Sequence, residues 1–567
     1  MKKTVFGLIL IISLCVSIFY GYQKAGFHED EYYTYFSSNR SIGLYQPDRE
    51  WQDRQTILDE FSVKEGEGFN YGLVKLVQSW DVHPPVYYYI FHTFCSLVPG
   101  VFSRWPGLIT NLFAFALSFI VLVLIMERLK LPLYTEAMVL MFWGLNPQTI
   151  SCNMLIRMYA WLTLAVFACA YVHIRLLQEY NKNYASVKHF VTESILPVMV
   201  VGFVGFLIQY FFIFFFFVIG FVTFVYILFF RKNIRNAFLY AAGCAVSLAL
   251  AVMYYPASLH HMLGGYRGNE AAGSFLDIPG TWERLSFFFG LFRDFVFAGG
   301  LVLIVLILFV CGIFKMLQER APHKAGAGMG PIEGKRKDSK PVAENTDAAT
   351  KNRKGAEGEG RIHLTAARKK ARLPRPEVEA LTCASIGYFL LTSKTALLVG
   401  AASNRYEMPI YGLLILLIFM DADYILSSVA GKKLLTVFYA FCLLLLIKGH
   451  FYDRNILFLY PEDTVKIAYA AENSSEVAIV MFNPGTPQNV WRLTDELLMY
   501  PSVFYMDEEN LSPITDPRII KATKIILYAA DSDSQSESFK NLLTSCPHLT
   551  TLQKVSVEDM WITYVVN

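Results

Sequence analysis

Apolar segments of about twenty residues recur along most of this chain and constrain its fold more than any other feature. A helix needs about 20 such residues to cross the ~30 Å hydrocarbon core of a bilayer. The chain has 567 residues, of which 54% are hydrophobic, and its mean hydropathy is +0.38. The nine cysteines form no CxxC pair, so neither a zinc site nor a redox motif is indicated. The sequence predicts a polytopic α-helical membrane protein.

The distribution of basic residues sets the register of the spans. If the apolar segment 86–101 crossed the membrane, the later basic turns would lie outside, against the positive-inside rule. If it lies on the outer surface as an interfacial helix, those turns fall in the cytoplasm. The turns contain Arg128 and Lys130, Lys182 and Lys188, Arg231, Lys232 and Arg235, and Lys432 and Lys433. We therefore expect eleven spans and an interfacial helix at 86–101.

The expected spans describe a multi-pass protein of the cell membrane. They place the N-terminus in the cytoplasm and the C-terminal part on the extracytoplasmic side. The start, Met1-Lys2-Lys3 before an apolar run, resembles a signal peptide but lacks a small-x-small cleavage site, which favours an uncleaved first helix. The spans are 4–21, 105–126, 133–150, 158–177, 190–208, 211–230, 236–256, 286–314, 379–401, 408–428 and 434–449.

Composition divides the chain into four parts. Residues 1–314 form the membrane core and include a large extracytoplasmic loop at 22–104. Residues 315–376 are basic and poor in apolar side chains, which favours a disordered cytoplasmic loop over a patch for anionic headgroups. Residues 377–449 hold the last membrane helices. Residues 450–567 alternate strand-like and helix-like segments, including strands at 477–482, 525–528 and 561–566 and helices at 489–499 and 536–543, which predicts a small extracytoplasmic α/β domain.

Two polar segments in the first loop carry the residue types that catalysis requires. His28-Glu29-Asp30-Glu31 follows the first helix directly, and Asp81-Val82-His83-Pro84-Pro85 precedes the interfacial helix. A carboxylate beside low-dielectric surroundings suits a general base. The plainer interpretations are a solvated loop for the acidic triplet and a helix start capped by Asp81 or His83.

Taken together, these motifs resemble the GT-C class of membrane glycosyltransferases. The resemblance is strongest to the branch of protein O-mannosyltransferases and aminoarabinose transferases, glycosyltransferase family 39 and its relatives. The first two motifs that resemble the family are the pair of acids after the first helix and the segment Asp81-Val82-His83-Pro84-Pro85-Val86-Tyr87-Tyr88. Three further motifs follow in the expected order: Arg104-Trp105-Pro106, Arg157-Met158-Tyr159-Ala160 and Arg405-Tyr406 with Pro409. Gln209-Tyr210-Phe211 stands where many members have Thr-His-Tyr, and the insert at 315–376 lies outside the pattern.

The resemblance implies an inverting glycosyltransferase that moves a sugar from a polyprenyl-phosphate donor to an acceptor on the outer face of the membrane. Asp30, with Glu31 beside it, would be the catalytic base. Arg405, Arg157, Arg104 and Tyr406 would bind the donor phosphate, since arginine suits bidentate contact with phosphate oxygens. Asp81, His83, Tyr159, Gln209 and Tyr210 would line the substrate pocket.

Several alternatives remain open at this stage. The arginines would otherwise be headgroup anchors or ion-pair partners, and Arg104 would pair with the acidic motif. Phe211–Phe217 reads most simply as lipid-facing helix, with a groove for the isoprenoid tail as the second interpretation. A transporter or flippase, or a non-catalytic receptor for lipid-linked sugars, would use the same lipid partner. We expect the membrane and an acceptor glycan, lipid or protein as partners, no nucleic acid, and no metal site, although a divalent cation is possible.

Overall fold

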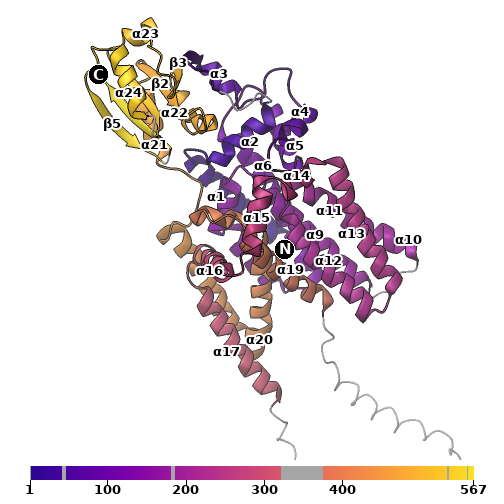
Figure 1. Cartoon of the computed structure of the whole chain (residues 1–567). Coiled ribbons are helices and arrows are strands. Elements are labelled where there is room, and N and C mark those ends of the chain that lie inside the picture. The colour runs from indigo at the N-terminus through magenta and orange to yellow at the C-terminus, as the bar shows by residue number, and fades with distance from the viewer. Residues whose placement is uncertain (1, 41–45, 181–185, 321–374, 533–534, 559) are drawn as a thin grey trace, which may run out of the picture.

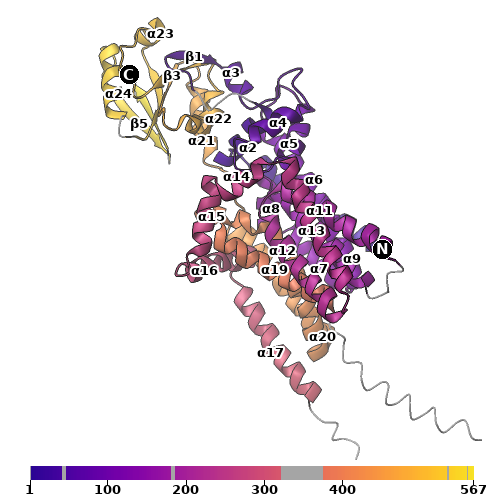
Figure 2. The same cartoon turned by 45° about the vertical axis from the view of Figure 1, so that its right-hand side comes forward.

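The computed structural model describes residues 2–40, 46–180, 186–320, 375–532, 535–558 and 560–567, and it shows a helical bundle with a small sheet domain at one end (Figures 1 and 2). Nine segments within these ranges are long and apolar enough to cross a membrane. They are Lys2–Gln23 (α1), Arg104–Leu129 (α6), Tyr159–Tyr180 (α9), Val187–Ile208, Phe212–Phe230, Ile234–Tyr254 (α13), Leu301–Gln318, Met408–Val429 and Gly431–Tyr452. The prediction of a polytopic helical membrane protein is confirmed.

The remaining expected spans differ in detail. The segment 133–150 is broken into α7 (Leu133–Gly144) and α8 (Pro147–Met154), because Asn146 caps α8 and Pro147 opens it. The segment 286–314 is divided between α16 (Thr281–Leu291), which continues as a π-helical turn to Val296, and α17 (Leu301–Arg320). α19 (Pro376–Thr395) is 20 residues long and carries charged side chains near both ends.

The last two spans form a helical hairpin within α20 (Met408–Ile447). Gly431 has φ +68°, a conformation that glycine adopts without steric cost. The rings of Phe419 and Tyr439 stack with their centroids 5.6 Å apart, whereas twenty residues of straight helix would separate them by about 30 Å. The chain therefore reverses at Gly431, as the separate predicted spans 408–428 and 434–449 require.

The first loop contains four short helices rather than a further span. They are α2 (Glu29–Asn39), α3 (Arg54–Asp59), α4 (Tyr71–Gln78) and α5 (Val86–Ser96). With 11 residues, α5 is only about 16 Å long and too short to cross a bilayer. The helix expected at 86–101 is thus present and ends at Ser96.

The C-terminal domain contains a six-stranded mixed sheet with the order β1-β3-β2-β4-β6-β5. Two clusters of apolar side chains cover its faces, one with α21 (Asp463–Glu472) and α22 (Thr494–Leu497), the other with α23 (Pro517–Ile520) and α24 (Gln535–Ser545). The strands are β2 (Val477–Phe482), β3 (Ser502–Asp507), β4 (Ile525–Ala530), β5 (Leu552–Val557) and β6 (Trp561–Val566). The expected helix at 489–499 is instead a 3-10 turn, Pro487–Leu493, followed by α22.

The edge strand β1 (Glu50–Asp53) comes from the first loop and not from the C-terminal segment. It pairs antiparallel with β3, with Trp51 opposite Phe504. The indigo segment that contains β1 and α3 lies beside the C-terminal sheet in both cartoons (Figures 1 and 2). The predicted boundary at residue 450 therefore does not enclose the whole sheet.

The predicted basic loop at 315–376 lies largely outside the described residues. Its first residues, Lys315–Arg320, belong to the end of α17, and Pro376 opens α19. The expected boundaries are corrected at these two points, because helical hydrogen bonding extends beyond the apolar stretch that marks a span.

Candidate functional site

The first turn of α2 places two acidic side chains in different surroundings. His28 caps the helix: its Nδ1 accepts a hydrogen bond from the backbone N–H of Asp30 at 3.1 Å. The Glu31 carboxylate accepts the N–H of His28 at 2.6 Å, which completes a capping box. Acidic side chains are also stabilised at this end of a helix by the helix dipole. The cap fixes the direction in which Asp30 and Glu31 project.

Glu31 is fully buried and bonded on all sides by structural partners. Its Oε2 lies 2.9 Å from Nζ of Lys24, and both side chains are 0% exposed. Its Oε1 accepts the backbone N–H of Ile156 at 2.6 Å. Burial raises the pKa of Glu31, and the charge of Lys24 opposes that shift. Glu31 thus ties α2 to the end of α1 and to the segment before α9.

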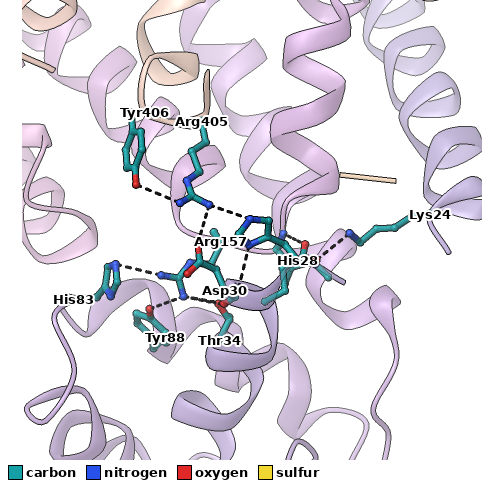
Figure 3. Close-up of polar contacts among 11 residues, drawn as sticks. Lys24, His28, Asp30, Thr34, His83, Tyr88, Arg157, Arg405 and Tyr406 are labelled. Atoms are coloured by element: carbon teal, nitrogen blue, oxygen red, sulfur yellow. Dashed lines mark hydrogen bonds and ion pairs between the residues drawn. The ribbon is translucent and has the colours of Figure 1, made fainter. Parts of the chain in front are cut away.

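Asp30 faces the opposite way and meets two arginines (Figure 3). Nη1 of Arg405 lies 2.7 Å from Oδ2 of Asp30, and Nη2 of Arg405 donates to the Tyr406 hydroxyl at 3.2 Å. Nη1 of Arg157 donates to the Asp30 carbonyl at 3.0 Å and to Oγ1 of Thr34 at 3.1 Å. Arg405 comes from a 3-10 turn (Gly400–Tyr406) before α20, and Arg157 from the segment between α8 and α9. Three regions that are distant in sequence therefore meet at Asp30.

His83 connects Arg157 to a second carboxylate. Nη2 of Arg157 lies 3.2 Å from Nε2 of His83, and Nδ1 of His83 lies 3.1 Å from Oδ2 of Asp81. A guanidinium only donates, so Nε2 must accept and Nδ1 must carry the proton given to Asp81. Asp81 fixes the tautomer of His83, which in turn orients Arg157.

A cavity of about 400 Å³ opens at this cluster. Its lining includes eight of the eleven residues predicted for the site: Asp30, His83, Arg157, Tyr159, Gln209, Tyr210, Arg405 and Tyr406. Three predicted residues do not line it. Glu31 and Asp81 lie behind Asp30 and His83, and Arg104 donates to the backbone carbonyl of Lys24. Arg104 holds the junction of α1 with the loop, at the start of α6.

The cavity wall is electropositive. Its charged lining residues are Arg157, Arg267 and Arg405 against Asp30 and Glu270, which leaves a formal charge of three minus two, or +1. Burial would raise the pKa of Asp30, but the charges of Arg157 and Arg405 outweigh it, and the pKa lies below its ordinary value. Asp30 is therefore ionised, with its side chain 30% exposed to the cavity. Such a wall suits an anion.

The lining also includes residues that were not predicted, among them those of two short helices. α14 (Ala257–Leu263) supplies His261, and α15 (Tyr266–Leu276) supplies Arg267 and Glu270, whose side chains pair at 3.1 Å. The i,i+3 spacing of Arg267 and Glu270 was the available signal, but nothing in the sequence places that loop over the cavity.

The phenylalanine-rich run divides between two environments. Phe211, Ile213 and Phe214 line the cavity, whereas Phe217 is 66% exposed on the outside of the bundle. The two interpretations of this run therefore apply to different faces of α12 (Phe212–Val225). Among the residues that the structure describes, no group of three His, Cys, Asp or Glu side chains could hold a metal ion.

No protein-family model matches this chain, and no curated protein sequence matches it either. Among solved structures, the chain is similar to the apo crystal structure of ArnT from Cupriavidus metallidurans. The sequence identity is 11%, the alignment covers 100% of this chain and 97% of that chain, and the TM-score is 0.46. Because identity and TM-score are both low, the function has to be argued from the chemistry of the cavity.

Proposed function

We propose that this protein is an inverting glycosyltransferase that takes a sugar from a polyprenyl-phosphate donor and transfers it to an acceptor on the outer face of the membrane. The observation that carries the proposal is the Asp30 carboxylate, which pairs with Arg405 on a cavity lined by apolar side chains and by Arg157 and Arg405. The donor has the same two parts, since an isoprenoid chain is apolar and its phosphate is an anion.

The arginines bind the donor phosphate. Arg405 is 7% exposed and Arg157 is buried, and cations in such places rarely occur without a functional partner. The Tyr406 hydroxyl and the His83–Asp81 pair hold the two guanidinium groups in orientation. The phosphate of the departing lipid is a stable anion, so charge stabilisation by arginine replaces the general acid that a poorer leaving group would need.

Asp30 is the base that takes the proton from the acceptor hydroxyl. Its pairing with Arg405 makes it a weak base. An incoming phosphate supplies a competing negative charge to Arg405 and Arg157. The charges that lower the pKa of Asp30 are then partly neutralised, and its pKa rises. Donor binding thereby activates the base. The acceptor oxygen attacks the anomeric carbon, the bond to the phosphate oxygen breaks with its electron pair, and the configuration inverts.

The apolar half of the cavity accommodates the start of the isoprenoid chain. Its apolar lining includes Phe211, Ile213 and Phe214 of the α12 region, Phe275 of α15, and Leu397. The arrangement lets the phosphate reach the arginines while the chain stays in an apolar environment.

Basic side chains at the other end of the bundle support the proposed orientation. Lys2 pairs with Glu127 at 3.3 Å, Arg231 lies over the Tyr180 ring, and Lys432 lies over the Tyr134 ring. The positive-inside rule assigns that end to the cytoplasm. The cavity and the sheet domain then lie outside, with the N-terminus of α1 inside.

The test is release of polyprenyl phosphate from a polyprenyl-phosphate sugar by the full-length protein in detergent, with a mixed acceptor extract. We expect turnover by the wild type and its loss in Asp30→Asn and Arg405→Ala. Arg175→Ala is the matched control, because Arg175 pairs with Glu179 and Glu193 away from the cavity. Tight lipid binding without release in the wild type would favour the transporter interpretation and contradict the proposal.

A further inference from the structure

The C-terminal domain does not stand apart from the catalytic cluster, because it packs directly on the helix that carries Asp30. Trp491, from the 3-10 turn Pro487–Leu493, is 4% exposed. Its ring centroid lies 4.6 Å from that of Phe36 and 5.0 Å from that of Tyr33, both on α2. Its indole Nε1 donates to Oε2 of Glu60 at 2.9 Å. One tryptophan of the domain thus contacts both α2 and the segment that follows α3.

Aromatic contacts extend from Trp491 to the start of α2. Trp491 packs edge-on against Phe61 at 5.8 Å, and Phe61 stacks on Phe102 at 4.8 Å. Phe102 stacks on Phe27 at 5.1 Å, and Phe27 immediately precedes His28, the residue that caps α2. Aromatic pairs at these separations add about 0.5–1.5 kcal/mol each beyond their burial. The domain is therefore coupled to both the body and the cap of the catalytic helix.

Backbone contacts join the same parts. Strand β1 of the first loop completes the domain's sheet through its pairing with β3. Ala25 donates its N–H to the carbonyl of Leu459 at 2.7 Å, and the side-chain Nζ of Lys24 donates to the carbonyl of Phe458 at 2.8 Å. The chain entering the domain is thus bonded to the chain entering α2. A domain attached only through its covalent link to the last helix would make none of these contacts.

We propose that the C-terminal domain is part of the catalytic unit and that Trp491 is a positioning residue, which sets Asp30 in place by holding α2. The inference rests on the function proposed for Asp30. Trp491 does not line the cavity, so its effect on Asp30 is indirect. Its effect passes through Tyr33 and Phe36. Since a displacement of about 1 Å at a reacting group can lower a rate by roughly 10²-fold, loss of this packing is expected to reduce turnover.

The experiment compares Trp491→Ala, Trp491→Phe and a matched control, Phe539→Ala, in the full-length protein. Phe539 lies on α24 and packs against Tyr564 on the face of the sheet away from α2. We expect Trp491→Ala to lower turnover at saturating donor about 10- to 100-fold. Trp491→Phe restores most of it because the ring contacts remain, and Phe539→Ala stays within about twofold of the wild type.

Two further readouts separate positioning from a general loss of stability. Hydrogen exchange of the α2 amides should rise in Trp491→Ala and stay unchanged in Phe539→Ala. The effects of Phe36→Ala and Trp491→Ala on turnover should be strongly non-additive, because both remove the same contact. Unchanged α2 exchange in Trp491→Ala overturns the proposal whether or not turnover is detected. Equal turnover in Trp491→Ala and Phe539→Ala overturns it as well. Failure of the proposed function is seen separately, as wild-type turnover that does not depend on Asp30.

Discussion

Replacing Asp30 with asparagine should affect binding and turnover in opposite directions. The Asp30 carboxylate occupies Nη1 of Arg405 at 2.7 Å, so it competes with any anion for that guanidinium. Asparagine keeps the shape and removes the charge. A bound phosphate no longer has to displace an ion pair, and its affinity rises, while the proton acceptor is lost.

The size of both effects follows from the geometry. A hydrogen bond to a charged group contributes about 1.5–3 kcal/mol, and each 1.4 kcal/mol corresponds to about tenfold in affinity. Because the Asp30 side chain is 30% exposed, the lower end of that range applies. We expect Asp30→Asn to bind polyprenyl phosphate about tenfold more tightly. Loss of a general base lowers turnover by roughly 10²–10⁴-fold.

The assay is a titration of the full-length protein in detergent with polyprenyl phosphate, beside release of the same lipid from a sugar donor. Glu270→Gln is the control, since Glu270 also lines the cavity but pairs with Arg267 at 3.1 Å. We expect it to change affinity and turnover by less than about threefold. Weaker phosphate binding by Asp30→Asn, or turnover within threefold of the wild type, would refute the assigned roles of Asp30 and Arg405.

Three other predictions concern stability and substrate fit. Glu31→Gln leaves the buried Lys24 ammonium without its counter-charge and should destabilise the protein by about 3–5 kcal/mol. Its thermal midpoint should be lower than that of Asp30→Asn, and an equal midpoint would contradict the structural role of Glu31. Phe214→Ala removes an apolar side chain from the cavity wall and should raise the KM for a long-chain donor roughly 10-fold, about 1.5 kcal/mol of lost burial. Phe217→Ala, on the exposed face, should leave the KM unchanged. Equal KM values for the two variants would exclude the α12 wall as a binding surface for the isoprenoid. Burial raises the pKa of Glu60 to about 7, so the folded protein binds the proton more tightly than the unfolded chain and its stability falls as pH rises from about 4.5 to 7. Glu60→Gln should remove this slope of at most ~1.4 kcal/mol per pH unit, measured by denaturation at a series of pH values. An unchanged slope would show that another group titrates.

The class of fold and the polar cluster on one side of the cavity were predictable from the sequence. Apolar length fixes which segments can span a membrane, and that rule anticipated the segments that contain α1, α6, α9 and α13. Short motifs that resemble those of the GT-C glycosyltransferases pointed to Arg157, Arg405 and Asp30. Such residues stand out because a charge beside hydrocarbon is costly unless it has a partner.

The sequence did not distinguish the roles of two adjacent residues of one type. Asp30 and Glu31 are both acids in one helical turn, and the sequence offered both as catalytic. The structure separates them because successive residues of a helix point about 100° apart, one toward the arginines and the other toward Lys24. Arg104 was also grouped with the phosphate-binding arginines, and only the structure shows that it begins α6, donates to the Lys24 carbonyl and does not line the cavity.

By itself the sequence determined that the chain is a membrane bundle, that a polar loop stands at one end, and that particular charged residues in it need partners. These are properties of single segments, set by hydrophobic length, caps and the cost of burying charge. Only the tertiary structure decided which charges meet, that β1 of the first loop enters the C-terminal sheet, and that Trp491 packs on the helix carrying Asp30. Contacts between segments more than 400 residues apart depend on how the whole chain packs, and no local pattern records them.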